Sequence, residues 1–362
     1  MLIPSIICVI ITLFMLLVPW SSEIMQKLKR KIKNKIFHDK RCQRIGRIPH
    51  KRNKKSKTQS TKSPASHRII APSKLSVFSY PSETISFFNE LNDIIKRCSR
   101  NDFIYFDLSE ISFITPDAIM YLLAIIKNNR RLRSFNITCE GNMPKNVTAR
   151  DLFHQVGFFR FVYSSKSYVV NTSTEFMKIQ NGNNANSQMA SSFCDFVHES
   201  FEKTIKDTKR LYQMIVELMA NTYQHAYEEH ERTNLFSNWY IFAHNLGNSI
   251  QFVFLDTGLG IPRTVAKKHL ERIAGAVGLK NDVSYLVSAL QGSEFRSETG
   301  KKYRGKGLPE IYDDCCKSKI KNLRVISGKA KCLVKNDSTV QSELLTSSFD
   351  GTMFSWEISK GE

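Results

Sequence analysis

The sequence predicts an α/β protein with two folded parts, and three observations lead to this fold class. Hydrophobic residues make up 41% of the 362 positions and aromatic residues 11%, which is enough to bury a core. From residue 75 onward, short apolar runs of strand length alternate with apolar residues at helical spacing. An asparagine-rich stretch at 181–188 interrupts this alternation, so we expect a domain boundary there.

The first part, at 75–165, is expected to be a small layered α/β domain. Ser82 to Arg97 carries apolar residues at helical spacing after a Ser/Thr start. The full set of expected elements is helices at 82–97, 117–127 and 151–157 and strands at 103–108 and 136–140. Such alternation of strands and helices is typical of α/β layers. A polar linker at 166–192 is expected to follow this domain.

Residues 106–119 read Phe-Asp-Leu-Ser-Glu-Ile-Ser-Phe-Ile-Thr-Pro-Asp-Ala-Ile. This segment resembles the central strand, loop and helix of STAS domains, the fold of anti-sigma-factor antagonists. In that family a serine of the loop is phosphorylated, and Pro116 stands here at the position of that serine. The resemblance therefore implies a STAS-like α/β domain and leaves a phosphorylation switch at this position in doubt.

The second part, at 193–362, opens with a long helical pattern at 201–229. Its apolar positions are Leu211, Met214, Ile215, Leu218 and Met219. Glu217, Asn221 and His225 follow one another at steps of four residues, so they lie along one stripe of the helix. A carboxylate, an amide and an imidazole on one stripe could serve a metal ion and a water molecule. An exposed polar face is the alternative interpretation.

Three glycine-containing segments follow in order. An apolar strand at 250–255 ends in Asp256-Thr-Gly258-Leu-Gly260. Arg304-Gly305-Lys306-Gly307-Leu308 then opens another helix, and a strand at 351–358 begins with Gly351-Thr352. Each segment is a weak signal alone, because glycine often marks only a turn. Their order after the Glu-Asn-His stripe is specific.

Together these four segments resemble the GHKL ATPases, which include DNA gyrase, heat-shock chaperones, histidine kinases, mismatch-repair ATPases and anti-sigma serine kinases. Glu217 to His225 resembles the N box, Asp256 to Gly260 the first glycine box, and Arg304 to Leu308 the second. The resemblance covers about residues 195–360. It implies a Bergerat-fold α/β sandwich, a mixed sheet with helices on one face, and a mobile ATP lid at 263–303.

By this resemblance, ATP and Mg²⁺ are the expected cofactors. Asp256 would accept a hydrogen bond from the adenine amino group with help from Thr352, and Gly258 and Gly260 would let the backbone approach the nucleotide. In the second glycine box, Gly305, Lys306 and Gly307 precede a helix, whose N–H groups and dipole hold phosphate. The resemblance places Arg304 and Leu308 in the same box.

The resemblance gives the remaining roles to the N box. Asn221 would bind Mg²⁺, for which a neutral amide oxygen is a suitable ligand. Glu217 would be the base that orients water or a protein hydroxyl. His225 is interpreted either as a phosphate contact or as a packing residue.

The expected function is that of a regulatory ATPase in which nucleotide closes the lid and changes which partner is bound. Two alternatives stay open: an anti-sigma-type protein serine/threonine kinase, and a nucleotide-sensing membrane adaptor that does not hydrolyse ATP. A sensor histidine kinase fits less well, because it needs an acceptor histidine on a separate dimerising helix, whereas His198-Glu199 precedes Glu217 by only 19 residues, on or next to the same helix. The partner is expected to be an unidentified regulatory protein, and dimers are common in the family.

The N-terminal residues predict how the protein is located. Residues 2–22 contain no charged side chain, so a single-pass membrane anchor is expected at 1–22 with the bulk of the chain in the cytoplasm. A basic linker at 23–74 follows, in which residues 27–68 hold 17 Lys/Arg against one acid. This segment would lie on anionic lipid headgroups. Nucleic acid is the less favoured partner, because charge alone is weakly diagnostic. If translation starts at Met25, the protein would be cytoplasmic without an anchor.

The eight cysteines form no C-x-x-C pair, and no histidine cluster accompanies them. The sequence therefore predicts neither a zinc site nor a disulfide framework.

Overall fold

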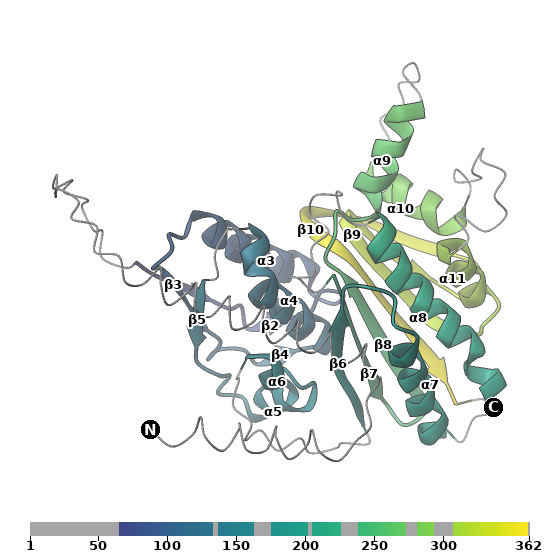
Figure 1. The fold of residues 1–362 in the computed structure, drawn as a ribbon, viewed down its shortest axis with the longest axis horizontal. Helices are drawn as coiled ribbons and strands as arrows, with labels where there is room; N and C mark the ends of the chain where they lie inside the picture. The colour runs from purple at the N-terminus through teal and green to yellow at the C-terminus, as the bar shows by residue number, and fades with distance from the viewer. Residues whose placement is uncertain are drawn as a thin grey trace, which may run out of the picture. The chain divides into compact units, whose positions relative to one another are not determined.

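A computed structural model describes residues 65–132, 137–162, 175–201, 205–225, 238–272, 281–292 and 307–360. The chain divides into two units, 1–62 and 63–362, and every described residue belongs to the second. The described residues form helices and three sheets, so the expected α/β class is confirmed (Figure 1).

The expectation of a membrane-anchored protein is corrected. Among the described residues no helix combines the length and apolar character needed to cross a bilayer. Residues 1–22, on which that expectation rested, lie outside the described part, as do residues 23–64 of the basic linker. The anchored localisation is therefore not retained.

The N-terminal part is built on a parallel sheet with strand order β1-β3-β5. Its strands are β1 (Ser66–Ile70), β3 (Phe103–Asp107) and β5 (Thr138–Gly141), and β2 (Lys74–Leu75) pairs with β4 (Phe113–Ile114) separately. The helices are α3 (Pro81–Arg97), α4 (Pro116–Leu132), α5 (Val147–Gln155) and α6 (Phe159–Val162). All five elements expected in this part are present, with shifted ends, and Pro116 is the first residue of α4.

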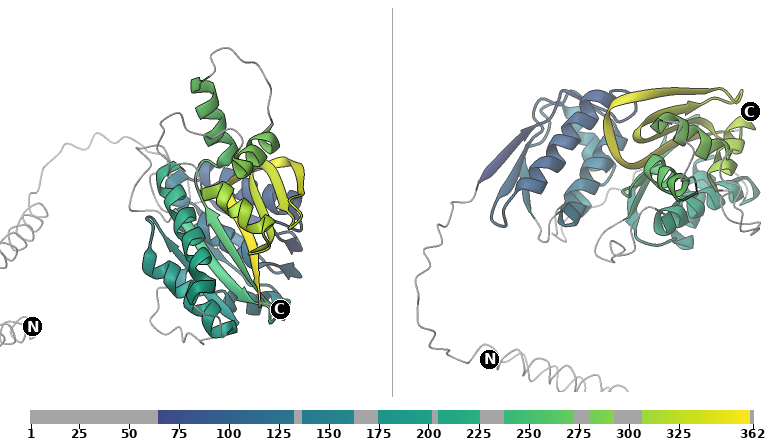
Figure 2. Two further views of the ribbon diagram at one scale, coloured as in Figure 1. Left: turned by 90° about the vertical axis from the view of Figure 1, so that its right-hand side faces the viewer. Right: turned by 90° about the horizontal axis from the view of Figure 1, so that it is seen from above.

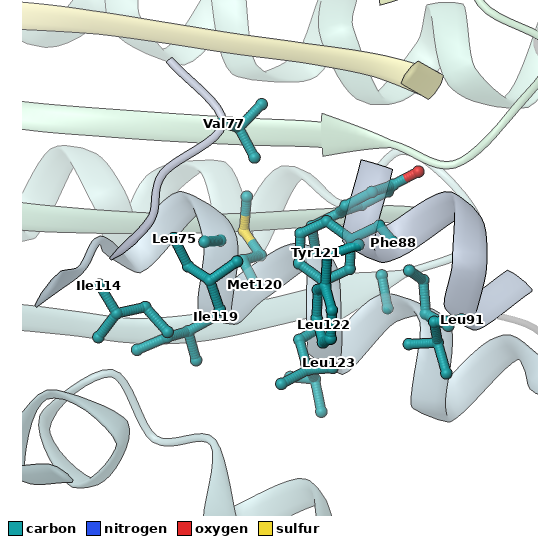
Figure 3. Packing of buried hydrophobic residues seen from close by; sticks show 14 of the residues in the cluster. Leu75, Val77, Phe88, Leu91, Ile114, Ile119, Met120, Tyr121, Leu122 and Leu123 are labelled. Atoms are coloured by element: carbon teal, nitrogen blue, oxygen red, sulfur yellow. The ribbon is translucent and has the colours of Figure 1, made fainter. Parts of the chain in front are cut away.

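Helix α4 is buried nearly all round. Every residue from 118 to 125 is buried, and Figure 3 shows Tyr121 beside Phe88 of α3, with ring centroids 4.7 Å apart. A helix with an apolar side chain on every face must be covered on every face. The cover comes from α3 and the N-terminal strands on one side and from the C-terminal part on the other.

Asp107, at the end of β3, ties three segments of the N-terminal part together. Its carboxylate accepts hydrogen bonds from Arg68 of β1, from Nδ2 of Asn142 at 2.8 Å and from Oγ of Ser109 at 2.8 Å. These donors, with Arg68 foremost, hold the pKa of Asp107 well below its usual range. The segment that resembles the STAS loop is thus fixed to the parallel sheet.

The C-terminal part contains a five-stranded sheet with strand order β6-β7-β8-β10-β9. Its strands are β6 (Phe176–Gly182), β7 (Trp239–Asn245), β8 (Ser249–Asp256), β9 (Lys321–Val334) and β10 (Val340–Ser359). Each described pairing in this sheet is antiparallel, whereas a mixed sheet was expected. Strand β6 and the start of the next helix occupy part of 166–192, the range expected to be a polar linker.

Five helices accompany this sheet in the described residues. They are α7 (Ser187–Phe201), α8 (Ile205–His225), α9 (Ile261–Arg272), α10 (Asp282–Gln291) and α11 (Gly307–Cys316). Figures 1 and 2 show α7, α8 and α11 on one face of the sheet. The helix expected at 201–229 corresponds to α8, whose described residues run from Ile205 to His225, and α7 precedes it as a separate helix.

Both faces of the sheet are buried, because alternate residues of each strand enter different cores. Trp239 and Ile241 of β7 pack with α7, α8, α10 and α11. Tyr240 and Phe242 of the same strand enter the core of the N-terminal part. Residues of β8 and β10 divide in the same way, as the period of two in a strand requires. The two parts therefore share one core across the sheet.

Candidate functional site

Helix α8 presents two of the predicted N-box residues on its outer stripe. Leu211, Met214, Ile215, Leu218 and Met219 are buried, as the helical spacing predicts. Glu217 is exposed and Asn221 is half-buried on the opposite stripe. His225 is the last residue of α8, and its side chain lies outside what the structure describes.

Gly307, the first residue of α11, lies directly against this stripe. A Cβ at Gly307 would lie 3.0 Å from Oε2 of Glu217 and 3.2 Å from Nδ2 of Asn221. Both are tighter than ordinary contacts, so only glycine leaves this space without displacing a polar side chain. The second glycine box thus meets the N box at the N-terminus of a helix, where backbone N–H groups favour anions.

An ion pair holds the two helices in this arrangement. Arg210 of α8 donates to both carboxylate oxygens of Asp314 on α11, from Nε at 3.2 Å and from Nη2 at 3.0 Å. Asp314 is buried, and its Oδ1 also lies 3.3 Å from Nζ of Lys319. A bidentate Arg–carboxylate pair fixes geometry as well as adding energy. It sets how Gly307 faces Glu217.

Asp256 and Thr352 lie opposite each other on neighbouring strands. Asp256 ends β8, and Thr352 of β10 is its partner in the antiparallel register. Oδ1 of Asp256 accepts the backbone N–H of Gly258 at 2.6 Å, which closes the turn before α9. Asp256 is half-buried and Thr352 is buried. The structure therefore brings together the first glycine box and the Gly-Thr strand start.

Ser327 of β9 organises this end of the sheet, although it was not predicted as a site residue. Its Oγ donates to the carbonyl of Gly351 at 2.9 Å and lies 2.9 Å from Oγ1 of Thr352. The same oxygen accepts the backbone N–H of Ile261 at 2.9 Å, which anchors the start of α9. The only sequence signal was a Ser-Gly pair, in a strand of mixed charged and apolar residues.

Two glycines at this end require backbone conformations that other residues avoid. Gly260 has a φ of +85°, and a Cβ there would lie 2.9 Å from Oγ of Ser327. Gly351 has a φ of +109°, and a Cβ there would lie 2.2 Å from the carbonyl oxygen of Asp256. The approach of β10 to the end of β8 therefore depends on glycine at position 351.

The N-terminal part holds the residues that precede Gly351. The hydroxyl of Tyr121 on α4 donates to the carbonyl of Asp350 at 3.1 Å, and Nδ2 of Asn92 on α3 donates to Oδ2 of Asp350 at 3.3 Å. The Tyr121 ring stacks on Phe349 with centroids 4.4 Å apart. Burial raises the pKa of Tyr121 well above its usual value, which keeps the hydroxyl a donor. Helices α3 and α4 thus position the segment that leads to Thr352.

Other predicted site residues lie outside the described part of the chain. Arg304, Gly305 and Lys306 fall in 301–306, so the phosphate contacts assigned to them stay predictions. Leu308, in the first turn of α11, packs at the edge of the core. Gly258 lies in the turn after β8, where its N–H donates to Asp256. Of the expected lid at 263–303, the structure describes most of α9 and all of α10.

The donor groups present suit the two expected cofactors. Glu217 and Asn221 offer oxygen atoms, which Mg²⁺ prefers, beside a helix N-terminus that favours phosphate. Asp256 is an acceptor at a half-buried position, and an ionised carboxylate has about four acceptor sites. The hydrogen bond to Gly258 therefore does not exhaust it. These residues fit a magnesium nucleotide.

Comparison with known proteins adds no relative to this picture. No protein-family model matches the chain, and a search of curated proteins finds no significant match.

Proposed function

We propose that this protein is an ATP-binding regulatory ATPase of the GHKL type, with a STAS-like N-terminal part and a Bergerat-type C-terminal sandwich. One observation carries the proposal. Gly307 lies against both Glu217 and Asn221, although 86 residues separate Asn221 from Gly307 in the sequence. The cross-strand pairing of Asp256 with Thr352 supports it, since these two residues were expected to bind the same adenine.

The chemistry proposed for the site divides between its two ends. Asp256 and Thr352 would orient the adenine, and the N-terminus of α11 would hold phosphate oxygens beside Gly307. Asn221 would ligate Mg²⁺. The bound nucleotide would supply the phosphoryl group that is transferred. Glu217 is exposed, so it could take a proton from water or from the hydroxyl of a docked protein.

The regulatory part of the proposal rests on α9, α10 and the N-terminal part. Ile261, the first residue of α9, donates its backbone N–H to Ser327, which also forms hydrogen bonds with Gly351 and Thr352. A nucleotide held by Asp256 and Thr352 would therefore bias the position of α9, where the lid begins. The contacts of Tyr121 and Asn92 with Asp350 connect the same segment to the STAS-like part. Closure of the lid would change the surface offered to a partner protein.

The test measures nucleotide binding and turnover on the full chain with Mg²⁺. We expect wild type to bind MgATP and release phosphate. Asp256→Asn replaces one carboxylate oxygen, which accepts hydrogen bonds, by an amide NH2 group, which donates them. Binding of MgATP should therefore weaken by about 10- to 100-fold. Glu217→Gln keeps the shape but removes the base, so binding should persist while turnover falls by about 100-fold or more. Thermal shift reports binding, because ligand at 100 times its dissociation constant adds about 2.7 kcal/mol.

Glu199→Gln is the matched control, because Glu199 is an exposed glutamate on α7, away from Gly307. It should leave binding and turnover unchanged. Binding without turnover in wild type would favour the serine/threonine kinase awaiting its substrate or the non-hydrolysing nucleotide sensor. Absence of nucleotide binding in a folded wild-type protein would overturn the proposal.

A further inference from the structure

Three side chains capable of binding metal meet at one edge of the N-terminal part. His67 lies on β1, Cys98 follows the last residue of α3, and Asp102 precedes β3. One donor atom of each, a ring nitrogen, the thiol sulfur and a carboxylate oxygen, lies within 4.8 Å of the other two. Nε2 of His67 is 3.5 Å from Oδ2 of Asp102. The three positions share no C-x-x-C or His-x-His spacing, so the sequence pattern does not reveal the cluster.

The imidazole of His67 provides a second observation that points to a ligand. Nε2 of His67 is shielded from solvent although 33% of the side chain is exposed, and it lies 3.5 Å from Oδ2 of Asp102 without a well-aligned hydrogen bond. A buried polar atom without a well-formed hydrogen bond carries a desolvation cost. A metal ion bound to this nitrogen would remove that cost, since the atom already faces Asp102 and Cys98.

The carboxylate of Asp102 is held in place by the backbone. Oδ1 accepts the N–H of Ala65 at 3.0 Å, and Oδ2 accepts the N–H of Ser99 at 2.6 Å. Two hydrogen bonds leave acceptor sites on the carboxylate, because an ionised carboxylate has about four. It is therefore a positioned ligand with room for an ion.

We propose that His67, Cys98 and Asp102 form a zinc site that fastens β1 to α3 and to the start of β3. A set of one sulfur, one nitrogen and one oxygen suits Zn²⁺, whereas Mg²⁺ and Ca²⁺ take oxygen ligands. Bonds of about 2.0–2.3 Å to a tetrahedral zinc place donor atoms roughly 3.3–3.8 Å apart. The distance from His67 to Asp102 already lies in that range, and the longest separation in the cluster must shorten by about 1 Å.

Three protein ligands leave the fourth position of a tetrahedral zinc ion open to water or to another ligand. The site also has a structural consequence. Strand β1 pairs only with β3 among the described strands, and it lies at the edge of its sheet. A metal that joins His67 to the turn before β3 would stabilise this edge in addition to the ladder of backbone hydrogen bonds.

The test uses the full chain, stripped of metal with a chelator and then titrated with Zn²⁺ and, as a spectroscopic probe, with Co²⁺. We expect one equivalent of tight binding and a rise in melting temperature with Zn²⁺. With Co²⁺ we expect a thiolate-to-cobalt charge-transfer band and the ligand-field bands of a tetrahedral ion. Cys98→Ser should abolish the charge-transfer band. His67→Gln should weaken Zn²⁺ binding by more than about 100-fold, since even residues that only support ligands change affinity by about 10- to 100-fold.

Cys316→Ser is the matched control, because its thiol is half-buried and does not belong to the cluster. It should leave stoichiometry, affinity and the cobalt bands unchanged. Cys98 is fully buried, so Cys98→Ser could fail to fold. His67→Gln alters a partly exposed side chain and should fold. If Cys98→Ser does not fold, the Zn²⁺ affinity of His67→Gln tests the proposal alone. A folded wild type without a tight equivalent of Zn²⁺, or a folded His67→Gln that binds as tightly as wild type, would overturn the proposal.

Discussion

At the scale of single residues, Gly351 determines how closely β10 can approach the end of β8. Its φ of +109° is unfavourable for any side chain, and its Cα faces the carbonyl oxygen of Asp256. The next residue, Thr352, is the register partner of Asp256. The geometry of the proposed adenine end therefore depends on a position where no side chain fits.

Gly351→Ala should lower the free energy of unfolding by about 2–4 kcal/mol, because it adds backbone strain and a contact at 2.2 Å. Urea unfolding followed by fluorescence measures the change. Gly247→Ala is the matched control: its φ is +87°, but a Cβ there meets nothing within 4 Å. It should cost only about 1–2 kcal/mol for the left-handed conformation. Equal costs at the two positions would show that the contact with Asp256 contributes nothing.

The sequence predicted Asp256 correctly as the end of a strand, because an apolar run that stops at a polar residue marks such an end. The strand expected to begin at Gly351-Thr352 was wrong in its start, since β10 runs from Val340 to Ser359 and these two residues lie within it. The sequence did not predict Ser327. A serine within an apolar strand has no local signal of its partners, and all three partners of Ser327 come from other segments. The cluster at His67 was missed for the same reason, since it forms only when α3 returns to β1.

At the scale of elements, α8 and α11 form the candidate catalytic surface. Neither helix alone places Glu217 beside a helix N-terminus. Their contact is fixed near the other end of α11 by Arg210 and Asp314. The charged form of Arg210 is favoured by this hydrogen bond, which raises the pKa of its guanidinium.

Arg210→Met should destabilise the protein by about 1–2 kcal/mol, because among the described residues it leaves the buried Asp314 with Lys319 as its cationic neighbour. It should also reduce turnover more than nucleotide binding, since Gly307 would no longer be held against Glu217. Urea unfolding and phosphate release measure the two effects. Lys317→Met, which removes an exposed i,i+4 partner of Asp313 on the same helix, is the control and should change both by little. A normal rate of phosphate release in Arg210→Met would contradict a positioning role.

The elements also show where sequence patterns fail. The apolar spacing of α8 was predicted correctly, but the first turns of α7, at 187–192, were placed in a linker because they adjoin an asparagine-rich stretch. Asn186 of that stretch caps the helix, since its Oδ1 accepts the N–H of Met189 at 2.9 Å. Asparagine marks both loops and helix N-caps, and the buried series Ala190, Phe193 and Val197 was the signal that could have separated them.

At the scale of the whole molecule, the two parts expected to be separate domains share a core. Tyr240 and Phe242 of β7, Val253 and Leu255 of β8 and Met353 of β10 pack with residues of α3 and α4. The sequence carried a sign of this in Trp239 to Ala243, because strands buried on both faces read as continuous apolar runs. Which segment covers each face could not be predicted, since that depends on tertiary packing between distant parts of the chain.

A fragment that spans 175–362 should aggregate or bind an apolar dye strongly, because it exposes the sheet face normally covered by α3 and α4. A fragment that spans 65–362 should stay soluble and unfold in one cooperative transition. Sedimentation, dye fluorescence and thermal unfolding compare the two. A soluble 175–362 fragment with a cooperative transition would contradict the shared core.

The place of β10 in the strand order bears on how the protein is made. β10 lies between β8 and β9, yet it follows both of them in the chain. A nascent chain that has emerged only as far as Val334 therefore carries β9 with no strand to pair with and β8 with one open edge. Open edges recruit other chains, so this stage of synthesis is the one most exposed to aggregation. A pause in synthesis while residues 334–340 are at the ribosome's exit would leave the chain in this state, and chaperone demand should fall once residues 340–359 have entered the sheet.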